Sequence, residues 1–303
     1  MRIGYPCINR SIGCSPSGKF RLASYSPERL ETTVEKNLAC LMNILRVNEN
    51  AGFLFFRISS DIIPFASHPV CMYPWQERFR QTLSDVGLFI RKNHFRISMH
   101  PDQFVLLNTP REDVLDRSVA ELQYHAVVLN LMGLDDTAKI QLHVGGVYAD
   151  KPASIERFVT NYDLLDMSVR SRLVIENDER LYSAADCLEI HEQTGIPVLF
   201  DVFHHSLNNQ HELVTDVLER VFASWRKATD GIPMVDYSSQ QPGKRAGAHA
   251  EHIDESDFLH FLKETGSSDF DLMLEIKDKE ESAKTALSLA RNDPRLVIQP
   301  GPG

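Results

Sequence analysis

Short apolar strand-like runs alternate with amphipathic helical stretches eight times along this chain of 303 residues. The strand-like runs are continuously apolar, as parallel strands covered on both faces require. We expect strands at 2–7, 53–59, 95–100, 139–144, 172–177, 197–202, 234–238 and 272–277, and helices at 27–49, 74–92, 111–133, 153–169, 182–194, 210–228, 255–266 and 279–291. An eightfold strand–helix repeat predicts an α/β protein with a single (β/α)8 barrel, with an open doubly wound sheet as the alternative.

The barrel is expected to occupy residues 1–297 as one catalytic domain, with 298–303 as a frayed C-terminal tail. Ser26 before Pro27 is typical of a helix start, and Ser154 resembles another. Gly195 suits a helix end. Long loops are expected after the first and seventh strands, at 10–24 and 240–250.

Charge and cysteine content restrict the environment. The net charge of −10 disfavours a nucleic-acid partner, but only weakly, because bound cations would cancel clustered carboxylates locally. No run approaches the roughly 18 apolar residues of a membrane span, and the start of the chain lacks a signal-peptide layout. The five scattered cysteines form no C-x-x-C pair, which favours a reduced, cytoplasmic protein, with Cys14 as a loop thiol.

Acidic and histidine residues stand where the apolar runs end. These residues are His100, His143, Glu176, Asp201, Asp236 and Glu275, and His204 follows Asp201 by three. In a parallel barrel the carboxyl ends of all strands meet at one face. A mixture of carboxylates and imidazoles binds Zn²⁺ or Mn²⁺, and Glu176 and Asp201 are suited to bridging two ions. The pattern therefore predicts one hydrolytic site with several metal ions.

The other histidines are less informative. His125, His191, His211 and His260 are expected inside helices as packed or surface residues, and His205 should face away from His204. His68, after the second strand, is intermediate between the two classes. The chain has no G-x-S-x-G elbow, P-loop or G-x-G-x-x-G, which disfavours serine hydrolase and nucleotide-binding chemistry.

Several motifs, in order along nearly the whole chain, resemble one family. They are Arg2-Ile3-Gly4-Tyr5-Pro6 with Asn9, Arg57-Ile58-Ser59-Ser60-Asp61, Ser98-Met99-His100-Pro101-Asp102-Gln103, Leu142-His143-Val144-Gly145-Gly146, Glu176-Asn177-Asp178 and Asp201-Val202-Phe203-His204-His205. The chain resembles the UV damage endonucleases, relatives of endonuclease IV among the xylose-isomerase-like barrels. The resemblance implies a metal-dependent nick 5′ to cyclobutane pyrimidine dimers, 6-4 photoproducts and abasic sites in duplex DNA.

The resemblance also implies roles for residues. A first metal maps to His100, His143 and Glu176, a second to Glu176, Asp201, Asp236 and Glu275, and a third to His204 and His249. Two to three divalent ions are implied, with Mn²⁺ favoured over Zn²⁺, Mg²⁺ or Co²⁺. Glu176, His143 and His68 are the expected catalytic residues. Tyr5 and Asn9 match residues that line the lesion pocket, and Gln103 and Phe104 match a wedge that enters the duplex. From their place in loops after strands, Arg10, Lys244 and Arg245 are expected to contact the DNA backbone.

Three positions depart from the family pattern. Asp236 stands where the family often has histidine, and aspartate remains a competent ligand. Met234 stands where some members have a modified lysine, which leaves the third metal short of a ligand. Phe104 stands where tyrosine is usual, so stacking should persist without the hydroxyl group.

Alternatives to this interpretation are an abasic-site endonuclease without photoproduct activity, a sugar isomerase or epimerase on the same barrel, and a barrel that has lost activity. The long loops carrying Arg10, Gln103 and Arg245 favour a macromolecular substrate over a sugar. The expected partner is damaged double-stranded DNA, and a monomer without an obligate protein partner is expected.

Overall fold

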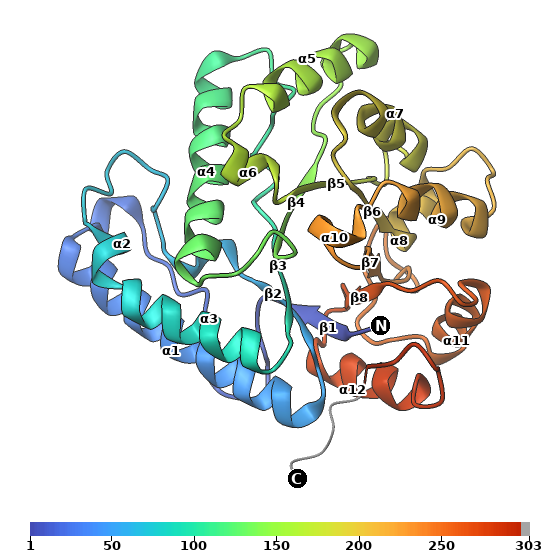
Figure 1. Ribbon diagram of the computed structural model, residues 1–303, viewed down its shortest axis with the longest axis horizontal. Coiled ribbons are helices and arrows are strands. Elements are labelled where there is room, and N and C mark those ends of the chain that lie inside the picture. The colour runs from blue at the N-terminus through green and yellow to red at the C-terminus, as the bar shows by residue number, and fades with distance from the viewer. Residues whose placement is uncertain (298–303) are drawn as a thin grey trace.

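The computed structural model describes residues 1–297 and confirms the single (β/α)8 barrel (Figure 1). The strands pair in parallel in chain order, and the last one closes on the first through Ile3 opposite Leu272. The strands are β1 Ile3–Pro6, β2 Phe55–Ile58, β3 Arg96–Met99, β4 Lys139–His143, β5 Leu173–Glu176, β6 Val198–Asp201, β7 Met234–Tyr237 and β8 Asp271–Leu274. Residues 298–303, expected as a frayed tail, lie outside the described residues.

Helices surround the barrel, and some predicted long helices are interrupted. The α-helices are α1 Pro27–Ala51, α2 Trp75–Arg78, α3 Arg80–Lys92, α4 Glu112–Leu131, α5 Lys151–Asp163, α6 Met167–Arg170, α7 Ala184–Thr194, α8 Val202–Leu207, α9 Val214–Ala223, α10 Lys227–Asp230, α11 Glu255–Glu264 and α12 Glu280–Leu289. The expectation that His211 lies in a helix is wrong. It precedes α9 with a φ of 65°, which a helix does not accommodate.

Helix ends follow local capping chemistry. The Ser26 side chain accepts a hydrogen bond from the Arg29 backbone N–H at 3.2 Å, with Pro27 at the first helical position, as predicted. Gly195 ends α7 with a φ of 71°, also as predicted. The prediction of a helix start at Ser154 is wrong, because Asp150 caps α5 instead by accepting from the Ala153 N–H at 3.0 Å.

Two layers of the barrel interior position the site, and the period of a strand explains both. Residues i and i+2 of a strand face the same side, so a residue that faces the barrel interior is followed, two positions later, by another that does. The lower layer is the apolar cluster of Phe55, Val174, Leu199, Trp225, Met234 and Met273. Two positions further along the same strands stand Arg57, Glu176, Asp201, Asp236 and Glu275. The apolar layer therefore forms a floor beneath a polar layer at the carboxyl ends of the strands.

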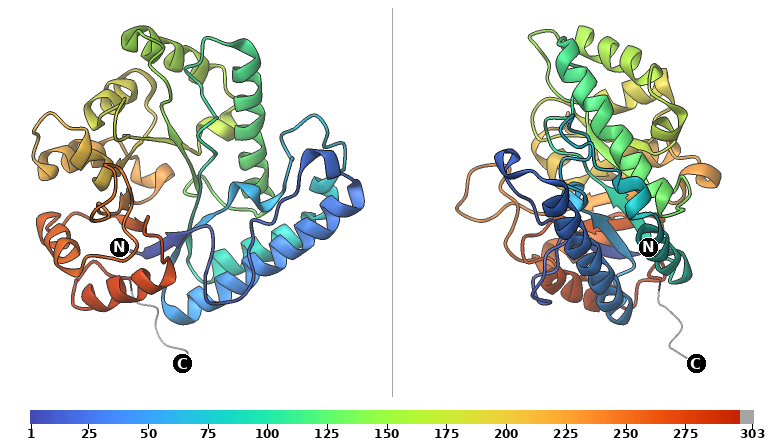
Figure 2. Two further views of the ribbon diagram at one scale, coloured as in Figure 1. Left: turned by 180° about the vertical axis from the view of Figure 1, so that it is seen from behind. Right: turned by 90° about the vertical axis from the view of Figure 1, so that its left-hand side faces the viewer.

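Two long loops project on the side of these strand ends. The loop after β1 and the loop after β7 lie on the same side of the barrel (Figure 2, right). Cys14 of the first loop forms a disulfide with Cys40 of α1, with 5.9 Å between their Cα atoms. The expectation of free thiols is therefore wrong for this pair, because folding brings the loop onto the helix at bridging distance. Cys7, Cys71 and Cys187 are free.

Within residues 1–297, every helix is too short or too polar to cross a lipid bilayer.

Candidate metal centre

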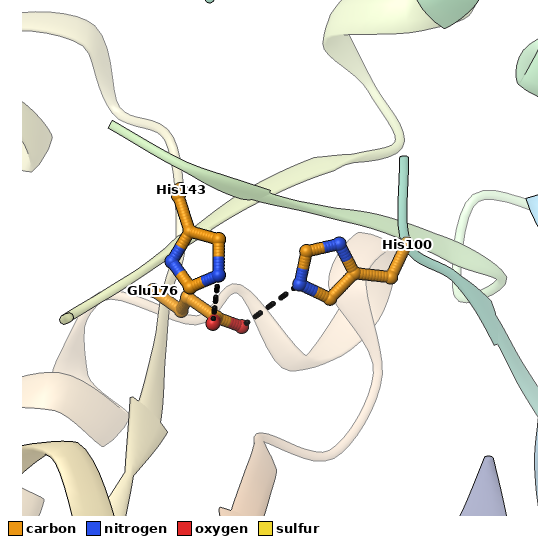
Figure 3. Close-up of side chains that lie close together, drawn as sticks. All are labelled: His100, His143 and Glu176. Carbon is orange, nitrogen blue, oxygen red and sulfur yellow. Dashed lines mark ion pairs between the residues drawn. The ribbon is translucent and has the colours of Figure 1, made fainter. Parts of the chain in front are cut away.

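Three predicted ligands from adjacent strands converge on one carboxylate (Figure 3). His143 Nε2 lies 2.9 Å from Glu176 Oε1, and His100 Nε2 lies 3.7 Å from Glu176 Oε2. His100 Nδ1 is 2.8 Å from the Pro101 carbonyl oxygen, so donation there leaves Nε2 with its lone pair directed to the centre. Burial would raise the pKa of Glu176, but the two histidines hold it well below its usual value.

Two further ligand groups share members with the first. Glu176, Asp201 and His204 form the second group, and Asp201, Asp236 and Glu275 form the third. In each group the ligand atoms lie within 4.8 Å of one another. Because Glu176 and Asp201 each belong to two groups, their positions fit the bridging role expected from the sequence.

The two histidines expected at the third metal take different places. His204, in the short helix α8 that follows β6, lies 3.4 Å from Asp201 Oδ2 through its Nδ1 atom and joins the second group. His249 belongs to no group among residues 1–297, although its ring centroid is 5.9 Å from that of His204. Its Nδ1 lies 2.9 Å from the Glu275 carbonyl oxygen, which leaves Nε2 available. The buried Met234 side chain belongs to the apolar floor.

Arg57, which the sequence reasoning missed as a site residue, sits among these carboxylates. Its Nη2 donates to Asp236 Oδ2 at 2.6 Å, and Nη1 donates to Glu275. Gln141 Nε2 donates to the same Asp236 oxygen at 2.6 Å. The signal was present in the sequence, because Arg57 is a lone charge inside the apolar run Phe55–Ile58. An inward charge in a closed barrel needs partners at the same level.

The charge balance of the centre shows a shortage of positive charge. Burial would raise the pKa of Glu275, but Arg57 lowers it to about 2. Burial and the neighbouring carboxylates raise the pKa of Asp201 to about 6 despite His204. Burial also raises the pKa of Asp236, against the opposing effect of Arg57. One guanidinium therefore does not neutralise the group of acids.

Buried oxygen atoms without partners provide a test of fit for metal ions. Glu176 Oε2, Asp201 Oδ2 and Asp236 Oδ1 are buried and accept no hydrogen bond within the described part of the chain. Buried carboxylate oxygens left in this state are costly unless a cation compensates them. Together with imidazole nitrogens they form the mixed donor set that Mn²⁺ and Zn²⁺ accept. The residues present thus fit divalent ions.

A cavity of about 840 Å³ opens above the centre. Its lining includes His100, Gln103, Phe104, Arg245, His249 and Glu275. The Phe104 side chain is 74% exposed and therefore does not pack in the core. Lys244 is exposed in the same loop as Arg245, and the exposed Arg10 donates from Nη1 to the Lys277 carbonyl oxygen at 3.1 Å.

Three other predicted residues lie away from the ligand groups. Tyr5 is fully buried against Phe53 and Phe56, and its hydroxyl accepts from Asn9 Nδ2 at 2.8 Å. The pair therefore supports the start of the β1–α1 loop in this structure instead of facing the cavity. His68 is exposed and lines a second cavity of about 850 Å³. Phe104 lines both cavities.

The fold and the strand-end ligands define a class: TIM-barrel proteins with a centre suited to several metal ions at the carboxyl face. The model of one family, UV-endonuclease UvdE, matches residues 1–296. The chain belongs to this family.

Individual relatives agree with this membership. A UV DNA damage endonuclease of Clostridium perfringens is 38% identical over 285 residues, covering 93% of this chain and 69% of that protein. The crystal structure of SacUVDE superposes with a TM-score of 0.93 at 45% identity, covering 98% of this chain and 100% of the other. D-psicose 3-epimerase of Clostridium cellulolyticum H10 has a TM-score of 0.57 at 12% identity, covering 82% of this chain and 92% of the other, and shares the fold alone.

Proposed function

We propose that this protein is a DNA repair endonuclease that makes a metal-dependent nick 5′ to UV photoproducts, with abasic sites as further substrates. The observation that supports it best is the set of three linked ligand groups at the carboxyl face of a UV-endonuclease family barrel. Cyclobutane pyrimidine dimers and 6-4 photoproducts are the proposed photoproducts. Mn²⁺ is the proposed ion, at two to three per site.

The residues divide the work of phosphodiester hydrolysis. His100, His143 and Glu176 would hold one ion, Asp201 and His204 would share another with Glu176, and Asp236 and Glu275 would hold a further ion with Asp201. His249, whose ring centroid lies 5.9 Å from that of His204, would add a ligand from outside these groups. Divalent ions held by these residues would supply positive charge to the scissile phosphate and would lower the pKa of a water molecule. Arg10, Lys244 and Arg245 are proposed to bind neighbouring phosphates. His68, which lines the second cavity together with Phe104, is a further proposed catalytic residue.

Damage would be selected by the ease of opening the duplex. A photoproduct stacks poorly, so extruding it costs less than extruding normal bases. Gln103 and Phe104 lie in an exposed turn that lines the cavity above the centre, and we propose that they fill the vacated space. Tyr5 and Asn9 would act on the lesion pocket through the loop that they brace.

A nicking assay tests the proposal. An end-labelled duplex with one thymine dimer is incubated with the protein in Mn²⁺ or in EDTA, beside an undamaged duplex and one with a single abasic site. We expect a nick 5′ to the dimer in Mn²⁺ and none in EDTA. Nicking of the abasic duplex alone would favour the abasic-site endonuclease, and equal nicking of undamaged DNA would refute damage recognition.

Metal affinity should depend on pH through His143. Burial would lower the pKa of His143, but Glu176 raises it to about 9. In the metal-free protein the imidazole is therefore protonated on both ring nitrogens at neutral pH. A histidine ligand must be neutral, so binding displaces this proton. We expect Mn²⁺ affinity to rise about tenfold per pH unit from pH 7 towards 9 and then to level off. Calorimetry in buffers of different ionisation enthalpy counts the released protons. A pH-independent affinity would contradict the assignment of His143 as a ligand.

Replacement of Phe104 by alanine should weaken cleavage of dimer-containing duplex by about one to two orders of magnitude, since base–aromatic stacking contributes roughly 1–3 kcal/mol. The effect should shrink when the lesion lies opposite a gap, where no partner bases need support. Leu164→Ala, an equally exposed apolar residue at the end of α5, serves as control. If Phe104→Ala lowers the melting temperature by several degrees and affects both substrates equally, the wedge role is wrong.

A further inference from the structure

The backbone at Lys279 is held in an unusual conformation beside the metal centre. Lys279 precedes α12 with a φ of 57° and a ψ of −111°, a region that side chains other than glycine rarely adopt. Such a strained conformation persists only where neighbouring residues enforce it. The next residue provides that enforcement, because the buried Glu280 carboxylate accepts from the Arg10 N–H at 3.0 Å and from the Ser11 hydroxyl at 2.5 Å.

The side chain of Lys279 differs from nearby cations in lacking a partner. Lys277, two residues earlier, forms an ion pair with Glu251 at 2.7 Å. Arg57 pairs with Asp236 and Glu275. Lys279 is half-buried, and within residues 1–297 its ammonium has no hydrogen-bond acceptor or ion-pair partner. Glu275 attracts this ammonium without contacting it. A partly desolvated cation that no acceptor contacts is costly, and an anionic ligand in direct contact would compensate it.

The surroundings identify the kind of anion. Lys279 lines the 840 Å³ cavity together with His100, His249 and Glu275, so it stands beside the predicted metal ligands. The carboxylates of the centre would repel a free carboxylate ligand. A DNA strand bound at the metal ions would instead bring phosphates on either side of the scissile one. A lysine binds phosphate as a compact point charge with several donors.

We propose that Lys279 is a DNA-binding residue that contacts one backbone phosphate of the strand held in this cavity, next to the phosphate at the metal ions. The proposal rests on the proposed DNA endonuclease function. The strained turn, fixed to the β1–α1 loop by Glu280, holds the ammonium in place before DNA arrives. Lys279 would thereby set the register of the strand relative to the centre.

The test combines Lys279→Met with neutralised phosphates. Binding of a duplex with one thymine dimer is measured by anisotropy in Ca²⁺, with gels to confirm that the duplex stays intact. A set of duplexes carries one uncharged methylphosphonate at each position around the dimer in turn. We expect Lys279→Met to weaken binding about tenfold and to lower the salt slope by about 1. At one position the methylphosphonate should weaken wild-type binding about tenfold and leave the variant unaffected.

Lys284→Met is the matched control, because it removes one positive charge from α12, the helix that Lys279 precedes, at a position where Lys284 pairs with the exposed Glu281. It should behave as wild type, and Lys279→Arg should retain most of the binding. Identical methylphosphonate profiles for Lys279→Met and wild type would overturn the phosphate contact. Failure of the proposed function has a different signature: wild type would bind dimer-containing and undamaged duplex equally.

Discussion

Replacement of Glu176 by glutamine is expected to lower nicking of a dimer-containing duplex by on the order of 10³ or more, while the barrel stays folded. Glu176 is buried at the end of β5 and belongs to two of the three ligand groups. The substitution removes a carboxylate that these two groups share, so the ions bound at both groups should bind weakly. Ions of this kind contribute several kcal/mol to stabilising the transition state, and each 1.36 kcal/mol is a factor of ten in rate. Metal analysis after dialysis should show reduced Mn²⁺ per chain.

Glu189→Gln, an exposed change on α7, is the control and should retain both activity and metal. The circular dichroism and melting temperature of Glu176→Gln in EDTA should stay close to wild type. Wild-type nicking by Glu176→Gln in Mn²⁺ would remove Glu176 from the catalytic centre.

Replacement of Arg57 by methionine is expected to destabilise the metal-free protein by about 3–5 kcal/mol, as breaking a buried ion pair does. Arg57 is 3% exposed and is shared by Asp236 and Glu275, so methionine leaves one buried and one partly buried carboxylate without their cation. Urea unfolding in EDTA measures the loss. Mn²⁺ should restore part of it, because bound ions supply positive charge to the same carboxylates.

Arg78 offers a contrast for this measurement. It pairs with Glu31 and Glu35 at the exposed surface, and Arg78→Met should change stability by no more than about 1 kcal/mol. The loss of stability caused by Arg57→Lys should lie between those of Arg57→Met and Arg78→Met. Lysine keeps the positive charge but lacks the planar guanidinium that donates to two carboxylates at once. If Arg57→Met and Arg78→Met are equally mild in EDTA, the ion pairs of Arg57 with Asp236 and Glu275 do not stabilise the metal-free protein.

Much of the centre could be predicted from the sequence because strand ends are local features. His100, His143, Glu176 and Asp201 each follow an apolar run, and the carboxyl ends of parallel strands must meet at one face. The strands and the barrel class could also be predicted, from the alternation of apolar strand-like runs with amphipathic helical stretches. Local chemistry also foretold the helix start at Ser26, whose oxygen reaches a backbone N–H only three residues away.

Contacts between distant segments required the folded structure. The grouping of His204 with Glu176 and Asp201 depends on where α8 begins after β6, and the pairing of Arg57 with Asp236 joins strands 179 residues apart. The burial of Tyr5 depends on its packing against Phe53 and Phe56, and the Cys14–Cys40 disulfide depends on how the β1–α1 loop lies on α1. The sequence by itself determined the barrel and the ring of strand-end ligands, because both follow from the period of a strand and the direction of a parallel sheet. Only the tertiary structure decided which charges neutralise one another and which side chains face the cavity, because these depend on distances between segments that local patterns do not encode.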